Sequence, residues 1–282
     1  MAFTYDEIKA RTASGDYSYG DRETMLYALG LGMGRAPLDP QELRYTYEKD
    51  LKTVPTMAAL FSARGNLLEG VNYTMVVHGE QRVTLHQPLP WKADLIVESR
   101  VAEALDKGAG KGAVIYLETT TKLKDTGAPV STSLSSIFAR GDGGFGGPSG
   151  PAPVQTHAIP DRAPDATCEL GTREDQALLY RLSGDRNPLH CDPDVAAAAG
   201  FPKPILHGLC TYGVSCRAVL QTICGYDHTK ITAFDARFSS PVYPGETVIV
   251  DMWVDGNLVS YRSRLKERDV VVINNGRAVL RD

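Results

Sequence analysis

An acid and a base lie five residues apart in the stretch YRLSGDRNPLHCDP, residues 180–193. Asp185 and His190 are separated by a short segment that contains Pro188. Because proline lacks a backbone N–H and disfavours helical angles at the residue before it, this segment is predicted to bend rather than continue a helix. A bend can bring a carboxylate and an imidazole to one side of a cleft, where together they can move protons.

A second motif, PILHGLCTYG, places a glycine where a long helix is predicted to begin. The N–H groups of a first helical turn have no partner inside the helix and lie at the positive end of its dipole. Gly208 is therefore predicted to offer its N–H to a substrate carbonyl oxygen on which negative charge develops. The second half of the chain thus supplies an acid, a base and an oxyanion donor.

These residues need elements to position them, and the sequence divides into two similar halves. Residues 141–165 are dense in glycine and proline and are predicted to link a domain of residues 1–140 to one of residues 166–282. Inside this linker GDGGFG matches a dinucleotide-binding pattern, but the prolines that follow exclude the helix which such a site requires. The short echo between VVHGEQ, with His78, and ILHGLC, with His207, supports a repeat.

Each half is predicted to contain helical segments followed by strands, which indicates an α+β fold with a helix packed on an antiparallel sheet. In the first half, helices are predicted from Asp21 and Thr53, and strands near 72–77, 94–104, 113–123 and 130–139. In the second half, a helix capped by Thr172 and a longer one from Leu206 precede the four predicted strands ITAFDARF, TVIVDMWV, LVSYRSRL and DVVVINNGRAVL.

The composition is that of an ordinary globular protein, with 43% hydrophobic residues, 23% charged residues and a net charge of −4 over 282 residues. No basic stripe favours nucleic acid and no apolar run is long enough to span a membrane, so neither partner is expected. The five cysteines form no C-x-x-C pair, and together with a start that lacks a secretion signal they predict a reduced, cytoplasmic protein without a metal site.

The motifs YRLSGDRNPLH and GFPKPILHGLC together resemble the hydratase 2 motif of the MaoC-like (R)-specific enoyl-CoA hydratases. LYALGLG, HGEQ, GGFGG and ARFSSPVYPGET extend the resemblance over nearly the whole chain, to the two-repeat hydratase domain of peroxisomal multifunctional enzyme type 2. This resemblance implies a double hot-dog fold, in which each repeat wraps an antiparallel sheet around a long helix. It also implies reversible syn addition of water to a trans-2-enoyl-CoA in fatty-acid or side-chain β-oxidation, yielding the (3R)-hydroxyacyl-CoA.

By position in the motif, the resemblance implies that Asp185 and His190 are the catalytic pair and that Gly208 contacts the thioester oxygen. Asn187 would brace the pair, although an Asx turn ahead of the proline explains this residue equally well. The family also has a functional glutamate in its first repeat, which Glu48 in RYTYEKD matches, with solvated surface as the alternative.

The first half has no G-D-x-N-P-x-H element, so one active site per chain is implied, and the first half is predicted to hold the acyl tail. Lys203 and Arg237 are candidates for the phosphates of CoA, or are simply surface charges. An acyl-CoA substrate, no separate cofactor and a homodimer are expected.

Two other functions stay open at this point. A (3R)-hydroxyacyl-thioester dehydratase of an acyl-carrier-protein pathway would use the same chemistry, whereas a non-catalytic acyl-CoA binding module would need no acid–base pair.

Overall fold

The structure, a computed structural model, describes residues 3–63 and 65–281. Within these residues the strands are β1 (Thr12–Tyr19), β2 (Val76–Leu85), β3 (Ala93–Asp106), β4 (Ala113–Leu123), β5 (Pro129–Ala139), β6 (Ala166–Gly171), β7 (Ile231–Phe238), β8 (Thr247–Asp255), β9 (Leu258–Leu265) and β10 (Val271–Leu280). The α-helices are α1 (Tyr5–Lys9), α2 (Asp21–Gly30), α3 (Pro40–Leu43), α4 (Gln176–Tyr180), α5 (Pro193–Ala198) and α6 (Gly208–Thr222). Short 3-10 helices are η1 (Pro55–Leu60), η2 (Tyr73–Met75), η3 (Arg181–Ser183), η4 (Pro188–His190) and η5 (His228–Lys230).

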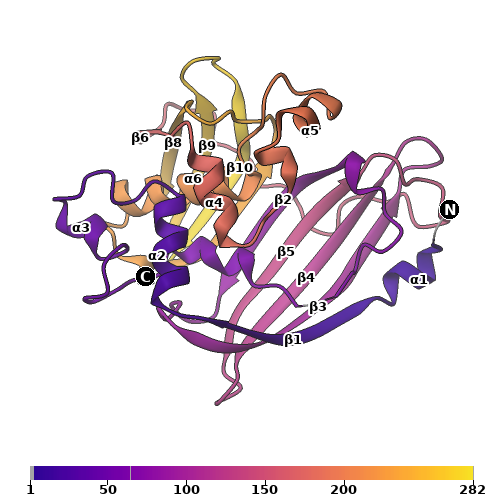
Figure 1. Cartoon of the computed structure of the whole chain (residues 1–282), viewed down its shortest axis with the longest axis horizontal. Helices are drawn as coiled ribbons and strands as arrows, with labels where there is room; N and C mark the ends of the chain where they lie inside the picture. The colour runs from indigo at the N-terminus through magenta and orange to yellow at the C-terminus, as the bar shows by residue number, and fades with distance from the viewer. Residues whose placement is uncertain (1–2, 64, 282) are drawn as a thin grey trace.

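All the strands belong to one antiparallel sheet with the order β1-β3-β4-β5-β2-β7-β10-β9-β8-β6 (Figure 1). The first half has the order β1-β3-β4-β5-β2, and the second half repeats it as β6-β8-β9-β10-β7. The two half-sheets join where β2 pairs with β7, with Gln81 opposite Ala236. This duplicated topology confirms the predicted α+β class and the double hot-dog plan.

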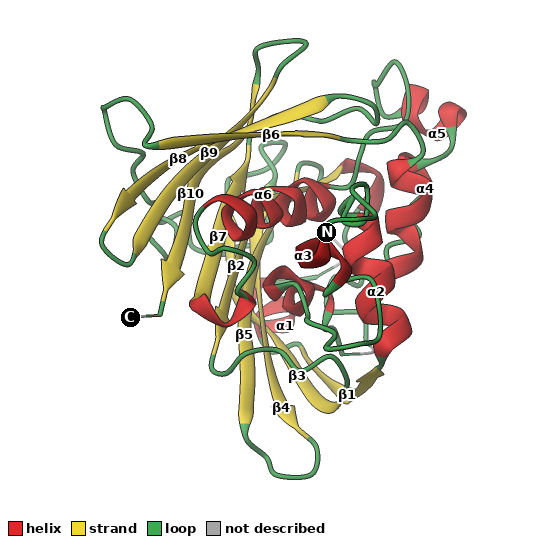
Figure 2. Cartoon of the chain, turned by 90° about the vertical axis from the view of Figure 1, so that its left-hand side faces the viewer, coloured by secondary structure: helices red, strands yellow, loops and turns green. Residues whose placement is uncertain are grey.

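The long helix of the second half, α6, lies across the sheet and is packed against β6, β7 and β8 (Figure 2). The helix predicted from Leu206 is confirmed, and it begins at Gly208. Every residue from Cys210 to Leu220 is buried. Gly213 allows the first half to approach this helix closely, because a Cβ at that position would lie 2.4 Å from Leu31. The start of α6 is therefore held by both halves.

The first half has no α-helix of this length among its described residues, and the helix predicted from Thr53 needs correction. The segment forms only the 3-10 helix η1, which contacts β2, β5, β7 and α6. It ends because Phe61 adopts extended backbone angles and packs its ring 5.2 Å from the rings of both Tyr17 and Tyr19. A short helix and loops thus stand where the second half has α6.

Several other local predictions need correction. The strand predicted near 72–77 begins at Val76, after the turn η2, and the edge strands β1 and β6 were not predicted. Thr172 does not cap a helix, since its hydroxyl donates to the Glu246 carbonyl, and Asp175 is the N-cap of α4. The remaining seven predicted strands match β3, β4, β5, β7, β8, β9 and β10 closely.

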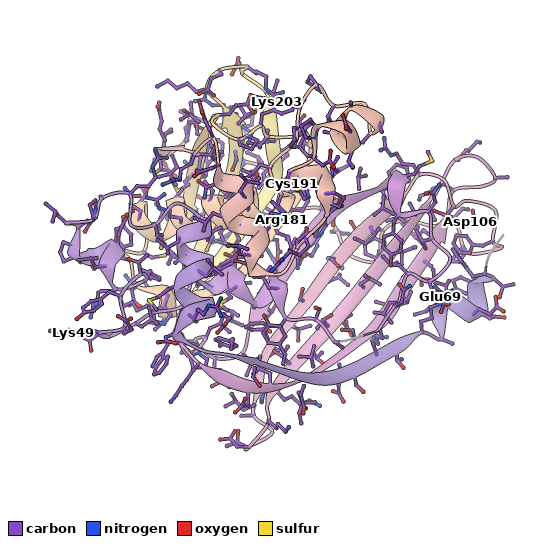
Figure 3. The ribbon with its side chains drawn as sticks, in the orientation of Figure 1. Lys49, Glu69, Asp106, Arg181, Cys191 and Lys203 are labelled. Carbon is purple, nitrogen blue, oxygen red and sulfur yellow. The ribbon has the colours of Figure 1, made fainter. Side chains whose placement is uncertain are left out.

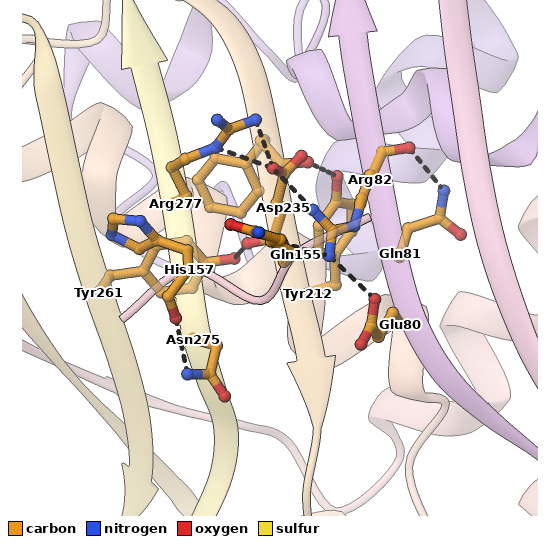
Figure 4. A network of polar contacts seen from close by, with 11 residues as sticks. Glu80, Gln81, Arg82, Gln155, His157, Tyr212, Asp235, Tyr261, Asn275 and Arg277 are labelled. Atoms are coloured by element: carbon orange, nitrogen blue, oxygen red, sulfur yellow. Dashed lines mark hydrogen bonds and ion pairs between the residues drawn. The ribbon is translucent and has the colours of Figure 1, made fainter. Parts of the chain in front are cut away.

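The segment 141–165, all of it described, forms no helix or strand. Its end is fixed over the joined strands, where the Gln155 carbonyl accepts from Arg82 and the His157 carbonyl accepts from Asn275 (Figure 4). Beneath it, the buried carboxylate of Asp235 on β7 pairs with Arg277 at 2.7 Å and with Arg82 at 3.9 Å. Charged contacts on this face therefore bind β2, β7 and β10 together.

Candidate active site

The turn that carries the acid–base pair is built from its own side chains. Gly184, with φ of 130°, ends η3, and the backbone N–H of Asn187 donates to Asp185 Oδ1 at 3.1 Å. Asn187 Oδ1 accepts from the Leu189 N–H at 3.0 Å and so caps η4, which contains His190. The predicted bend is confirmed, and Asn187 forms the Asx turn that fixes it.

Asp185 and His190 face each other across a narrow gap. Asp185 Oδ2 lies 4.0 Å from His190 Nε2, which is too far for a direct hydrogen bond. One water oxygen at ~2.8 Å from each atom would bridge that gap. The Asp185 side chain is 45% exposed and the imidazole only 9% exposed, so water can enter from the carboxylate side.

The protonation of His190 is set by a backbone carbonyl. His190 Nδ1 lies 2.8 Å from the Ile205 oxygen, and because a carbonyl only accepts, Nδ1 carries the hydrogen. In the neutral ring Nε2 is then a lone-pair acceptor that faces Asp185. Burial lowers the pKa of His190 below its usual value, against the opposing effects of the Ile205 hydrogen bond and the Asp185 charge. The ring is therefore neutral at neutral pH and able to take up a proton.

Gly208 is the first residue of α6, as predicted, and its N–H donates to no group among the described residues. The Phe238 ring, at the end of β7, covers this point, since a Cβ on Gly208 would lie 3.4 Å from it. A carbonyl oxygen placed here would meet a free N–H at a helix N-terminus beside an apolar wall.

Two histidines that the sequence analysis did not assign to the site lie at its walls. His207 stacks on His190 with the ring centroids 3.7 Å apart. His78, on β2 of the first half, packs edge-on against Phe238 at 4.9 Å. Burial lowers the pKa of His78 to about 4, and the Asp185 charge partly opposes this shift. The echo between VVHGEQ and ILHGLC was the available sequence pattern for both.

A groove of about 550 Å³ leads away from His190 and is lined by Cys191, Lys203 and Pro204, among others. Figure 3 shows Cys191 and Lys203 on the same side of the molecule. The Lys203 ammonium lies 5.4 Å from the centre of the Tyr243 ring and makes no ion pair among the described residues. Its charge is therefore available to an anionic ligand in the groove.

The structure does not bring Arg237 and Glu48 to this site. Arg237 precedes Phe238 on β7, and because successive side chains of a strand point to opposite faces, Arg237 points to the outer face. There it lines a small hollow with Glu80 and His157. Glu48 is exposed in the loop after α3, next to Lys49, which Figure 3 shows far from Cys191. Neither residue therefore lies beside Asp185 and His190 in this chain, and the roles assigned to both stay predictions.

Asp185, His190 and His207 have ligand atoms within 4.8 Å of one another, so a metal ion must be considered. The two imidazole planes are stacked only 29° from parallel. Lone pairs lie in the ring planes, so those of stacked rings run side by side and do not converge on one ion. The arrangement suits proton transfer better than metal binding.

Comparison with known proteins identifies the family. Residues 17–141 match the MFE-2 hydratase 2 N-terminal domain, and residues 155–276 match the MaoC-like domain. The chain is 39% identical to "Enoyl-CoA hydratase 2, peroxisomal" of Arabidopsis thaliana, over 91% of this chain and 89% of that protein. The chain belongs to the MaoC-like hydratase 2 family.

Two further matches cover nearly the whole of this chain. "3-hydroxyacyl-thioester dehydratase Y" of Mycobacterium tuberculosis is 43% identical over 90% of this chain and 88% of its own length. The crystal structure of a MaoC-like dehydratase from Phytophthora capsici superposes with a TM-score of 0.86 at 32% identity, covering 99% of this chain and 98% of that one.

Among the described residues, no helix is long and apolar enough to cross a membrane.

We expect Asp185→Asn and His190→Ala each to lower turnover by ~10²–10⁴-fold, since each removes one of two groups that hold the same water. The double variant should lose little more than the worse single variant, because the two groups act in one step. Steady-state hydration kinetics, with melting temperature as the control for folding, test this. Near-normal turnover in either single variant contradicts the assignment.

The pH dependence follows from the lowered pKa of His190. A base must be neutral to act, so kcat/KM should stay level around neutral pH and fall only as the pH drops through a value below 6.5, the usual pKa of His190. Arg181→Gln should move this acid limb to higher pH, because the Arg181 charge helps to keep the pKa of His190 low. A pH profile of kcat/KM over about pH 4.5 to 8, the range in which histidine titrates, measures the acid limb in the wild type and in Arg181→Gln. An acid limb that stays at the same pH in the variant contradicts this prediction.

Proposed function

We propose that this protein is an (R)-specific enoyl-CoA hydratase that adds water reversibly to trans-2-enoyl-CoA in β-oxidation. The observation that carries the proposal is the one-water gap of 4.0 Å between Asp185 and His190, beside the free N–H of Gly208. The near full-length similarity to a relative named enoyl-CoA hydratase 2 supports it.

The geometry explains how the reaction proceeds. A water in the gap directs one hydrogen to Asp185 Oδ2 and the other to His190 Nε2, which leaves an oxygen lone pair for C3 of the enoyl group. The group that takes the proton then returns it to C2 from the same side, which gives syn addition. As the enolate-like charge develops on the thioester oxygen, Gly208 N–H stabilises it by ~2.7–4 kcal/mol.

The CoA portion is proposed to lie along the groove beside Lys203, where the ammonium group meets a phosphate. Adding water to a double bond changes no net oxidation state, so the proposed reaction needs no redox cofactor, and no cofactor besides the CoA of the substrate is proposed. The acyl tail is proposed to extend toward residues 1–140, where the short η1 replaces a long helix and takes up less of the space over the sheet. A homodimer in the cytoplasm completes the proposal; some relatives are named as peroxisomal.

A carrier-protein thioester is the second candidate substrate, because the relative from M. tuberculosis is named a 3-hydroxyacyl-thioester dehydratase. Both substrates share the thioester end, so Asp185, His190 and Gly208 would act alike. Comparing kcat/KM for a CoA ester and the same acyl group on a carrier protein distinguishes them. A binding module without catalysis is opposed by the acid–base pair itself.

Hydration of crotonyl-CoA should consume the enoyl absorbance and yield the (3R) alcohol, because the acid–base pair and the Gly208 donor fix which face of C3 meets the water. Chiral analysis of the product measures this. No loss of enoyl absorbance removes the hydratase proposal, and a (3S) product removes the family mechanism.

A series of enoyl-CoA substrates from four carbons upward should gain up to ~0.8 kcal/mol in kcat/KM for each methylene that becomes buried. Ala59→Phe, which enlarges η1 where Ala59 packs against the core, should shorten the chain length at which the gain stops. Ala109→Phe in an exposed turn is the matched control and should leave the series unchanged. An optimum at four carbons, or equal series in all three proteins, means that the tail lies elsewhere.

A further inference from the structure

His207 touches both residues of the proposed proton-transfer pair. Its Nε2 lies 3.2 Å from the backbone oxygen of Asp185, and since a carbonyl only accepts, Nε2 is the N–H donor. Its ring lies on that of His190, with the centroids 3.7 Å apart. One side chain therefore holds the backbone of the acid and the ring face of the base.

The His207 imidazole also packs against Tyr180. The Tyr180 ring packs on it at 4.9 Å, so the imidazole is held between Tyr180 and His190, and the residue is only 1% exposed. His207 is also the N-cap of α6, directly before Gly208. Its position consequently ties the Asp185 turn to the oxyanion donor as well as to His190.

Stability alone does not account for a histidine at this place. His207 Nδ1 is buried and has no hydrogen-bond partner among the described residues, which is unfavourable for folding. A phenyl ring would make the same stack without an unsatisfied nitrogen. Compared with a phenyl ring, the imidazole adds the Nε2–H group, which donates to the Asp185 carbonyl.

The charge state of His207 suits this role. The titratable groups that face it are Tyr180 from α4, Arg181 from η3, and Asp185 and His190 from the turn that follows. Burial, and then the adjacent His190, hold the pKa of His207 below its usual value. A neutral His207 allows His190 to accept a proton, whereas a second positive charge at stacking distance would oppose it.

We propose that His207 is a positioning residue that sets the gap between Asp185 and His190, through its hydrogen bond to the Asp185 carbonyl and its stack on His190. The inference rests on the proposed hydratase function. A displacement of about 1 Å in such a pair can cost ~10²-fold in rate, so the effect should appear in kcat.

Two variants separate the two contacts. His207→Phe keeps a stacked ring and removes the donor, and it should lower kcat by roughly 10–100-fold with little change in KM. His207→Gln keeps an N–H donor and removes the ring, and it should recover part of the kcat that the phenylalanine variant loses. His228→Phe is the matched control, since the half-buried His228 on η5 also has a buried Nδ1 without a partner among the described residues and packs edge-on against Tyr45.

The control variant should keep the wild-type kcat even if its melting temperature changes. An NMR titration of the His190 ring gives a readout independent of turnover. The Asp185 charge raises the pKa of His190, so if His207→Phe lets Asp185 move away, that pKa should fall in the variant. Wild-type kcat and an unchanged His190 pKa in both His207 variants overturn the inference. An inactive wild type overturns the hydratase proposal instead, and the NMR comparison then still decides the role of His207.

Discussion

The pairing of β2 with β7 is the constraint on which the rest of the structure depends. It fixes the register between the halves, with Gln81 opposite Ala236, and so determines which side chains of β7 face the helices. Phe238 reaches both Gly208 and His78 only in this register. A slip of one residue would turn Phe238 to the outer face and Arg237 inward, which would replace the apolar wall beside Gly208 with a charge.

Backbone carbonyls, rather than carboxylates, orient the histidines of the site. His190 donates to Ile205, His207 to Asp185, and His78 Nε2 lies 3.0 Å from the Glu80 oxygen. Carbonyl acceptors fix the tautomer of each ring without adding a negative charge, so burial can keep the rings neutral. The Asp185 carboxylate is then not needed to orient an imidazole, and in the proposed mechanism it binds the reacting water.

Much of the fold could be predicted from the sequence, because β8 and α6 are continuous, largely apolar segments that are buried over most of their length. The edge strand β1 could not, since TASGDYSY is mostly polar and pairs on one side only, with β3. The helix predicted from Thr53 was too long, because its apolar residues are buried by tertiary packing of Phe61 and Met57 and not by a helical face.

The site residues that lie together in one local segment could be predicted from the sequence. Asp185, Asn187 and His190 lie in one turn, and Gly208 follows from the helix start. His78 and His207 act through contacts between distant segments, which spacing along the chain does not reveal. The outer-face position of Arg237 could not be predicted from the sequence, because the face that each side chain of β7 takes depends on the register of the sheet.

The shared sheet also determines what each half would be by itself. With β2 and β7 separated, each half would end in an unpaired inner strand whose backbone N–H and C=O groups are open along the run from Glu80 to Thr84, or from Ala233 to Arg237. Such an edge is a template for pairing with another chain. Duplication within one polypeptide therefore removes an aggregation-prone edge from each repeat, and it leaves only the short β6 and the mostly polar β1 at the rims of the sheet.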